Sequence, residues 1–232
     1  MAINGKQSQP NAASIIRWSG LAAIAGGLIF AGIQPIHPAD YLTSVTTGTW
    51  AAFMYAKLAM CLFFLVGITG IYGRQANRAG WLGLAGFALL IVTWFLQAVF
   101  IFTEGFILPI AAGVAPQLVE SFLTLANGTQ PTMDIGPAGA VYSIAGLCYM
   151  LGGLLFGIAT VRAGILPKWA AILLAVAAVV TPAAALLPHE LQRLAGIPVG
   201  LAVAWLGYGV WSLRQSVLAH ASAEAGLGQA VR

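Results

Sequence analysis

Long apolar segments alternate with short polar turns along most of this chain. Six of the segments are about 20 residues or longer, the length that a helix needs to cross roughly 30 Å of hydrocarbon. The pattern therefore predicts an all-α, polytopic transmembrane six-helix bundle that forms a single membrane domain over 1–232. The expected spans, flanked by short polar cytoplasmic tails at 1–13 and 215–232, are 14–36, 50–73, 81–108, 138–162, 168–187 and 196–214.

The longest connection between these spans, 109–137, carries an amphipathic pattern of its own. In 114–126, the apolar residues Leu118, Phe122, Leu123 and Leu125 surround Glu120, which predicts a short helix on the membrane surface. The turn-rich residues that follow are expected to form a loop. The first span begins after a polar lead, exceeds the apolar core of a signal peptide and lacks a small-residue cleavage site, so we expect it to be retained.

Composition agrees with membrane residence. Charged residues make up 7% of the chain, against roughly 25% in soluble domains, and hydrophobic residues reach 60% with a mean hydropathy of +0.91. A soluble fold of this size would lack the polar side chains to cover its surface. The lipid bilayer is therefore the expected partner, and the net charge of +4 is assigned to topology and not to nucleic-acid binding.

Basic residues collect at one set of segment ends. The N-terminal lead, the turns near 74–80 and 162–168, and the C-terminal tail hold eight of them, whereas the opposite loops hold only Arg193. By the positive-inside rule this distribution predicts a multi-pass protein of the cytoplasmic (inner) membrane with both termini in the cytoplasm. The eight residues are Lys6, Arg17, Arg74, Arg78, Arg162, Lys168, Arg214 and Arg232.

The spans also share features with one another. The first, third and fifth each begin with a basic residue close to a tryptophan, as in Arg17-Trp18 and Lys168-Trp169. Two interpretations stay open, namely three helical hairpins in tandem or the interfacial anchoring common to all spanning helices. Small residues line several spans and predict close helix packing, either within the bundle or against a partner membrane protein or homo-oligomer. They are Gly20, Ala23, Gly27, Ala31, Gly67, Gly70, Gly73, Gly153 and Gly157.

The Arg17-Trp18 start, the small-residue first segment and its end at Ile36-His37-Pro38 resemble bacterial six-helix integral membrane proteins of uncharacterised function. The resemblance covers the six-span layout. It implies no reaction, cofactor or site residue.

Lys57 is the most unusual polar residue. It lies seventeen residues before Arg74, or about 25 Å along a helix, and therefore inside the second span. An ammonium group at this depth costs about 3 kcal/mol unless it is paired or reaches water. Two alternatives follow: Lys57 extends to the headgroups, or it pairs with Glu104, which lies at the same level on the third span.

Further polar and aromatic residues share this outer level. His37 and His189, with Asp40 and Glu190 beside them, could hold a divalent metal or a haem, or could be histidines at water-exposed helix ends. The aromatic residues at similar depth are either ligand-pocket candidates or members of an interfacial belt. They are Trp50, Tyr55, Phe102 and Tyr142.

No phosphate-binding loop, nucleophile elbow, HExxH or CxxC motif occurs in the chain, and Cys61 and Cys148 are expected to be small apolar residues. The leading hypothesis is a non-catalytic binding or accessory protein that holds a lipid-like ligand or a partner membrane protein at its outer face. The alternatives are a metal- or haem-dependent membrane enzyme that uses the outer histidines and carboxylates, and a small-solute transporter.

Overall fold

The computed structural model describes residues 12–184 and 189–212, and this part of the chain is helical with no strand. Four helices are long and apolar enough to cross a membrane: Ser14–Ile36, Gly48–Ala111, Ala138–Ala163 and Arg193–Ser212. A shorter apolar helix covers Lys168–Thr181. The elements are α1 (Ala12–Ile33), η1 (Gln34–Ile36), α2 (Leu42–Val45), α3 (Gly48–Phe102), η2 (Thr103–Ile107), α4 (Leu108–Ala111), α5 (Pro116–Ala126), α6 (Ala138–Ala163), α7 (Lys168–Ala183), α8 (His189–Gln192) and η4 (Arg193–Gly196).

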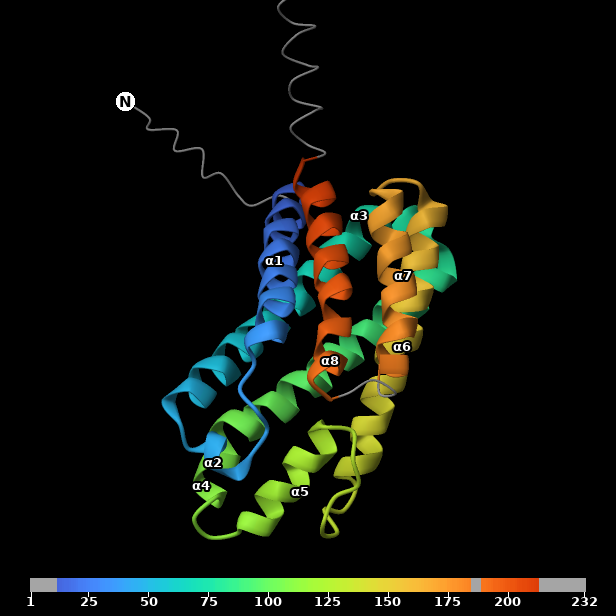
Figure 1. Ribbon diagram of the computed structural model, residues 1–232. Helices are drawn as coiled ribbons and strands as arrows, with labels where there is room; N and C mark the ends of the chain where they lie inside the picture. Colours follow the sequence, from blue (N-terminus) through green and yellow to red (C-terminus); the bar gives the residue numbers. More distant parts are fainter. Residues whose placement is uncertain (1–11, 185–188, 213–232) are drawn as a thin grey trace, which may run out of the picture.

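The 55-residue helix α3 has one non-helical residue, Gly80, with φ 60° and ψ −166°. This conformation is open to glycine, which lacks a Cβ, and strained for other residues. A straight helix of this length would extend about 80 Å. Instead, the chain reverses at Gly80, and the two arms of α3 run diagonally behind the other helices (Figure 1).

Small residues let the helices approach closely, as the sequence predicts. A Cβ on Gly67 would lie 2.6 Å from the Cα of Ala23, which packs the first arm of α3 against α1. A Cβ on Gly157 would lie 2.6 Å from the carbonyl oxygen of Ala171, which packs α6 against α7. Gly27 lies against Gly200 in the same manner, so α1 also contacts the last helix.

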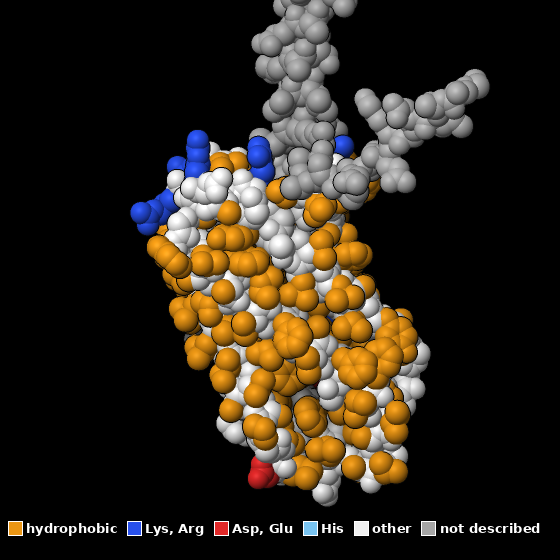
Figure 2. Space-filling model, turned by 180° about the vertical axis from the view of Figure 1, so that it is seen from behind, with side chains coloured by type: hydrophobic (Ala, Val, Ile, Leu, Met, Phe, Trp, Pro, Cys, Tyr) orange, Lys and Arg blue, Asp and Glu red, His pale blue; other side chains and the backbone are white. Residues whose placement is uncertain are grey.

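The surface of the bundle is apolar between two polar ends. Figure 2 shows hydrophobic side chains over most of one face, with Lys and Arg at one end and an acidic side chain at the other. Trp18, Trp81 and Trp169 are 66%, 85% and 67% exposed. A soluble monomer rarely exposes so large a continuous apolar surface, whereas a surface in contact with lipid requires it.

The connection between α3 and α6 contains the expected short helix. This helix, α5, turns Val119 and Leu123 into the protein and leaves Glu120 exposed. Of the predicted apolar residues, Leu123 is therefore buried, whereas Leu118, Phe122 and Leu125 are only partly buried. Cys61 and Cys148 are both free.

Candidate functional site

Lys57 and Glu104 form an ion pair between the two arms of the α3 region. The Nζ atom of Lys57 lies 3.2 Å from Oε2 of Glu104, and the side chains are 16% and 11% exposed. The structure therefore agrees with the second alternative for Lys57, which is pairing with Glu104 and not extension to the headgroups. Pairing offsets part of the cost of placing these charges among apolar helices.

A π-helical turn sets the position of Glu104. In η2 the N–H of Leu108 donates to the carbonyl of Thr103, five residues earlier. In that register the carbonyl of Glu104 would accept from residue 109, which is a proline and has no N–H. The indole Nε1 of Trp50 donates to this carbonyl instead, at 3.0 Å. One tryptophan thus supplies the hydrogen bond that Pro109 removes.

Gly105 lets the π-helical turn lie against the first arm of α3. A Cβ at this position would lie 2.8 Å from the Cβ of Met54, closer than packed side chains permit. Met54 precedes Lys57 by nearly one helical turn. The absence of a side chain at Gly105 therefore brings Glu104 within reach of Lys57.

His37 is held between a backbone carbonyl and the Lys57 ammonium. Its Nδ1 lies 2.7 Å from the carbonyl oxygen of Pro38, and its Nε2 lies 3.4 Å from Nζ of Lys57. A carbonyl only accepts and an ammonium only donates, so Nδ1 carries the proton and Nε2 offers its lone pair. Burial, reinforced by the charges of Lys57 and Arg193, lowers the pKa of His37 to about 3. The imidazole is therefore neutral at physiological pH.

A second ion pair, between Asp40 and Arg193, lies next to the first. Asp40 accepts from the Arg193 guanidinium, and the carboxylate is 5% exposed. His37 Nδ1 lies 3.9 Å from the other oxygen of Asp40. His37 thus lies between the two pairs, which come from four separate segments of the chain.

These groups form one wall of a cavity of about 500 Å³ at the end of the bundle opposite the basic turns. Aromatic and aliphatic side chains, among them Phe30, Met60 and Trp94, form an apolar floor. The polar residues that line it are Gln34, His37, Asp40, Lys57, Thr93, Gln97, Glu104, Asn127, Tyr142, Ser143, Tyr149, Thr181, Gln192 and Arg193.

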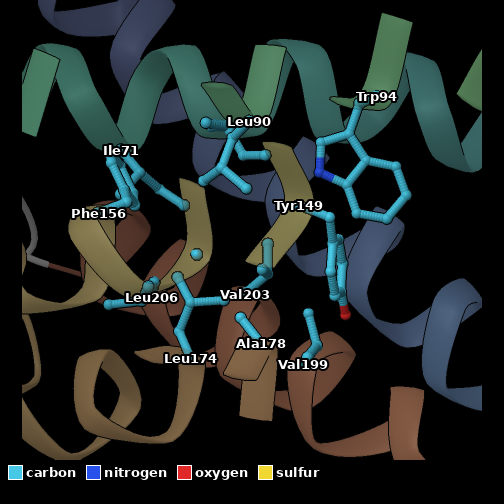
Figure 3. A pocket seen from close by; sticks show the side chains of 12 residues that line it. Ile71, Leu90, Trp94, Tyr149, Phe156, Leu174, Ala178, Val199, Val203 and Leu206 are labelled. Atoms are coloured by element: carbon cyan, nitrogen blue, oxygen red, sulfur yellow. The ribbon is translucent and has the colours of Figure 1, made fainter. Parts of the chain in front are cut away.

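Beneath this cavity the core is tightly packed. Trp94 and Tyr149 also border a second, apolar void of only about 10 Å³. Figure 3 shows these two rings on one side of the void, with Ile71 and Phe156 on the other. The large cavity therefore ends at Trp94 and Tyr149 and does not continue as an open path through the described part of the bundle.

Three of the four aromatic residues predicted as ligand-pocket candidates do not line the cavity. Tyr142 lines the cavity, but Tyr55 and Phe102 are 51% and 47% exposed on the surface, where both contact Phe106. Trp50 is 1% exposed, so it is neither a belt residue nor a cavity residue. It is a structural partner of Glu104.

Of the residues predicted to hold a metal or a haem, the structure describes the side chains of His37 and Asp40 only. The side chains of His189 and Glu190, which begin α8, lie outside the described residues. In the part that the structure describes, no group of three or more His, Cys, Asp or Glu side chains is arranged to hold a metal. His37 faces an ammonium with its only lone pair, which disfavours a cation there.

Several cavity residues were absent from the prediction. The charge distribution marks Arg193 only as an exception, and the sequence pattern does not indicate Gln97, Phe30 or Trp94 as site residues. Gln97 had a detectable signal, since it lies two turns before Glu104 on the same helix and shares its face.

The chain matches no protein-family model, no curated protein and no solved structure. The cavity and its two ion pairs are therefore the features that bear on function.

Proposed function

We propose that this protein spans the cytoplasmic membrane six times, with both termini in the cytoplasm, and binds a lipid-like amphiphilic molecule in its outer cavity. Binding, and not catalysis, is its primary role. The observation that carries this proposal is the 500 Å³ cavity with an apolar floor and a charged wall.

Six spans follow from dividing α3 at Gly80 and counting α7 as a span. Each arm of α3 then has enough residues to cross the hydrocarbon, and Arg74 and Arg78 lie near the reversal. The same-side location of these basic residues and the exposed Trp18, Trp81 and Trp169 supports a cytoplasmic face there.

Single cysteines test this topology in a background that lacks Cys61 and Cys148. Asn77→Cys is expected to react with a membrane-impermeant maleimide only after cells are opened, because residue 77 is exposed at the reversal. Thr129→Cys, in the exposed loop after α5, is expected to react in intact spheroplasts. Labelling of both positions from the same side would overturn the six-span arrangement.

The size and lining of the cavity support an amphiphilic ligand. Small-molecule sites usually enclose about 300–1,000 Å³, with mainly apolar walls and a few polar groups that orient the ligand. Here the polar groups lie at the outer level and the aromatic floor lies deeper. A molecule with a polar head and a short apolar chain satisfies both surfaces.

A cavity-filling variant tests ligand binding. Ala145 is buried and lines the cavity, so Ala145→Phe is expected to weaken binding of 1-decanoylglycerol at least tenfold by native mass spectrometry. Val176→Phe is the control, because Val176 is 55% exposed on the outside of α7. Equal binding by the two variants, or no binding by the wild type, would contradict the proposed function.

A further inference from the structure

The charges in the cavity wall cancel. Lys57 and Arg193 contribute two positive charges, and Glu104 and Asp40 contribute two negative charges, each within an ion pair. His37 between them is neutral, because Nδ1 donates to a carbonyl and Nε2 accepts from an ammonium. The described residues of the wall therefore present strong dipoles but no net charge to a ligand.

Two uncharged amides in the cavity have unused hydrogen-bonding capacity. The Oδ1 atom of Asn127 is buried and accepts no hydrogen bond. The Gln97 amide, which also lines the cavity, makes no hydrogen bond with the described residues. Buried polar groups normally have partners, so the unpaired Asn127 oxygen is an exception, and the half-buried Gln97 amide can both donate to a ligand and accept from it.

A charged ligand would gain little from this wall. Removing an ion from water is costly unless an opposite charge compensates it, and every charged side chain that the structure describes in this wall already has a partner of opposite sign. A hydroxyl group has a far smaller desolvation cost, which hydrogen bonds to the two amides would recover.

We infer that the cavity selects amphiphiles whose polar head is uncharged and carries hydroxyl groups, which exchange hydrogen bonds with the amides of Asn127 and Gln97. This inference rests on the proposed ligand-binding function and specifies its ligand class. The two ion pairs orient the head and reject ions of either sign.

Three probes with the same decanoyl or decyl chain test the selectivity: 1-decanoylglycerol, decanoate and decylammonium at pH 7.5. The wild type is expected to bind the glycerol ester at least tenfold more tightly than either ion. Asn127→Ala is expected to weaken binding of the glycerol ester several-fold. Asn77 is an exposed asparagine at the other end of the bundle, so Asn77→Ala is expected to leave this binding unchanged.

Charge variants provide a second measurement that depends on the ratio of affinities within one variant and not on the yield of folded protein. Glu104→Gln leaves Lys57 without its carboxylate and is expected to shift preference to decanoate. Lys57→Met leaves Glu104 unbalanced and is expected to shift preference to decylammonium. The double variant restores a neutral wall and is expected to prefer the glycerol ester again.

The outcomes separate the two proposals. If the wild type binds none of the probes, the ligand-binding function itself is overturned. If the wild type binds an ion most tightly, or if the single charge variants keep the wild-type order, the selectivity inference is overturned and the binding function stands.

Discussion

Loss of the Trp50 indole N–H is expected to destabilise the π-helical turn that carries Glu104. In Trp50→Phe an aromatic ring remains, but the Glu104 carbonyl loses its donor, and Pro109 cannot replace it. A buried carbonyl without a partner costs about 1–3 kcal/mol. For a protein of this size each kcal/mol corresponds to about 2–4 °C in Tm.

Trp94→Phe provides the matched control. Trp94 is 3% exposed, compared with 1% for Trp50, so both substitutions remove a similar buried ring. The Trp94 indole N–H makes no hydrogen bond within the described residues, so its replacement removes packing alone. Thermal unfolding in detergent, followed by circular dichroism, is therefore expected to give a Tm for Trp50→Phe that is about 2–12 °C lower than for Trp94→Phe.

A rescue variant completes the experiment. Pro109→Ala restores an N–H five residues after Glu104, in the register of the π-helical turn. In that background Trp50→Phe is expected to cost no more than Trp94→Phe. Equal losses for the two tryptophans in the wild-type chain, or failure of Pro109→Ala to reduce the difference, would refute this account of the turn.

Two further predictions concern His37 and the helix contacts. Because burial lowers the pKa of His37 to about 3 while an unfolded histidine titrates near 6.5, the unfolded state binds more protons as pH falls, so Tm is expected to fall between pH 6.5 and 5. His37→Gln, which keeps Lys57, Asp40 and Arg193 around the position, is expected to flatten this slope, and an unchanged slope would contradict the assignment. Gly27→Ala places a methyl against the backbone of the last helix and is expected to lower Tm by several degrees, whereas Gly32→Ala on the same helix meets open space and is the control.

The depth of polar groups was predictable from the sequence, but their direction around each helix was not. The helical rise places Lys57 and Glu104 at the same level, which is why their pairing was one of the expected alternatives. It does not say which side of the helix faces the bundle. Tyr55 and Trp50 lie at similar depth, yet the first points outward and the second is buried, because each faces a different neighbour.

The close packing of helices was predictable for a different reason. A row of small residues has one main physical use in a spanning helix, which is to admit another backbone. The partner of each row was not predictable, because the same row fits any helix that brings a small residue opposite. The sequence therefore predicted contacts at Gly27 and Gly157 but not that their partners are Gly200 and Ala171. The threefold hairpin repeat stays a prediction.

The π-helical turn was beyond sequence reasoning, although its components are visible in the chain. Pro109 within an apolar segment predicts a local break in helical hydrogen bonding. Which donor compensates for that break depends on Trp50, which is 54 residues from Glu104 in sequence and adjacent to it only after α3 reverses at Gly80. Long-range contacts of this kind require the fold.

The exceptions to the charge distribution were the strongest signal of the site. Of ten Lys and Arg residues, eight belong to the tails and turns of the expected basic end, where the proposed topology accounts for them. The two that do not, Lys57 and Arg193, both line the cavity and both pair with a carboxylate. A cation on the acidic side of a membrane protein opposes the positive-inside preference, so a local interaction must compensate it. The sequence thus indicates the four charged residues of the cavity wall, Lys57, Arg193, Asp40 and Glu104, whereas their pairing and their orientation toward the cavity depend on the fold.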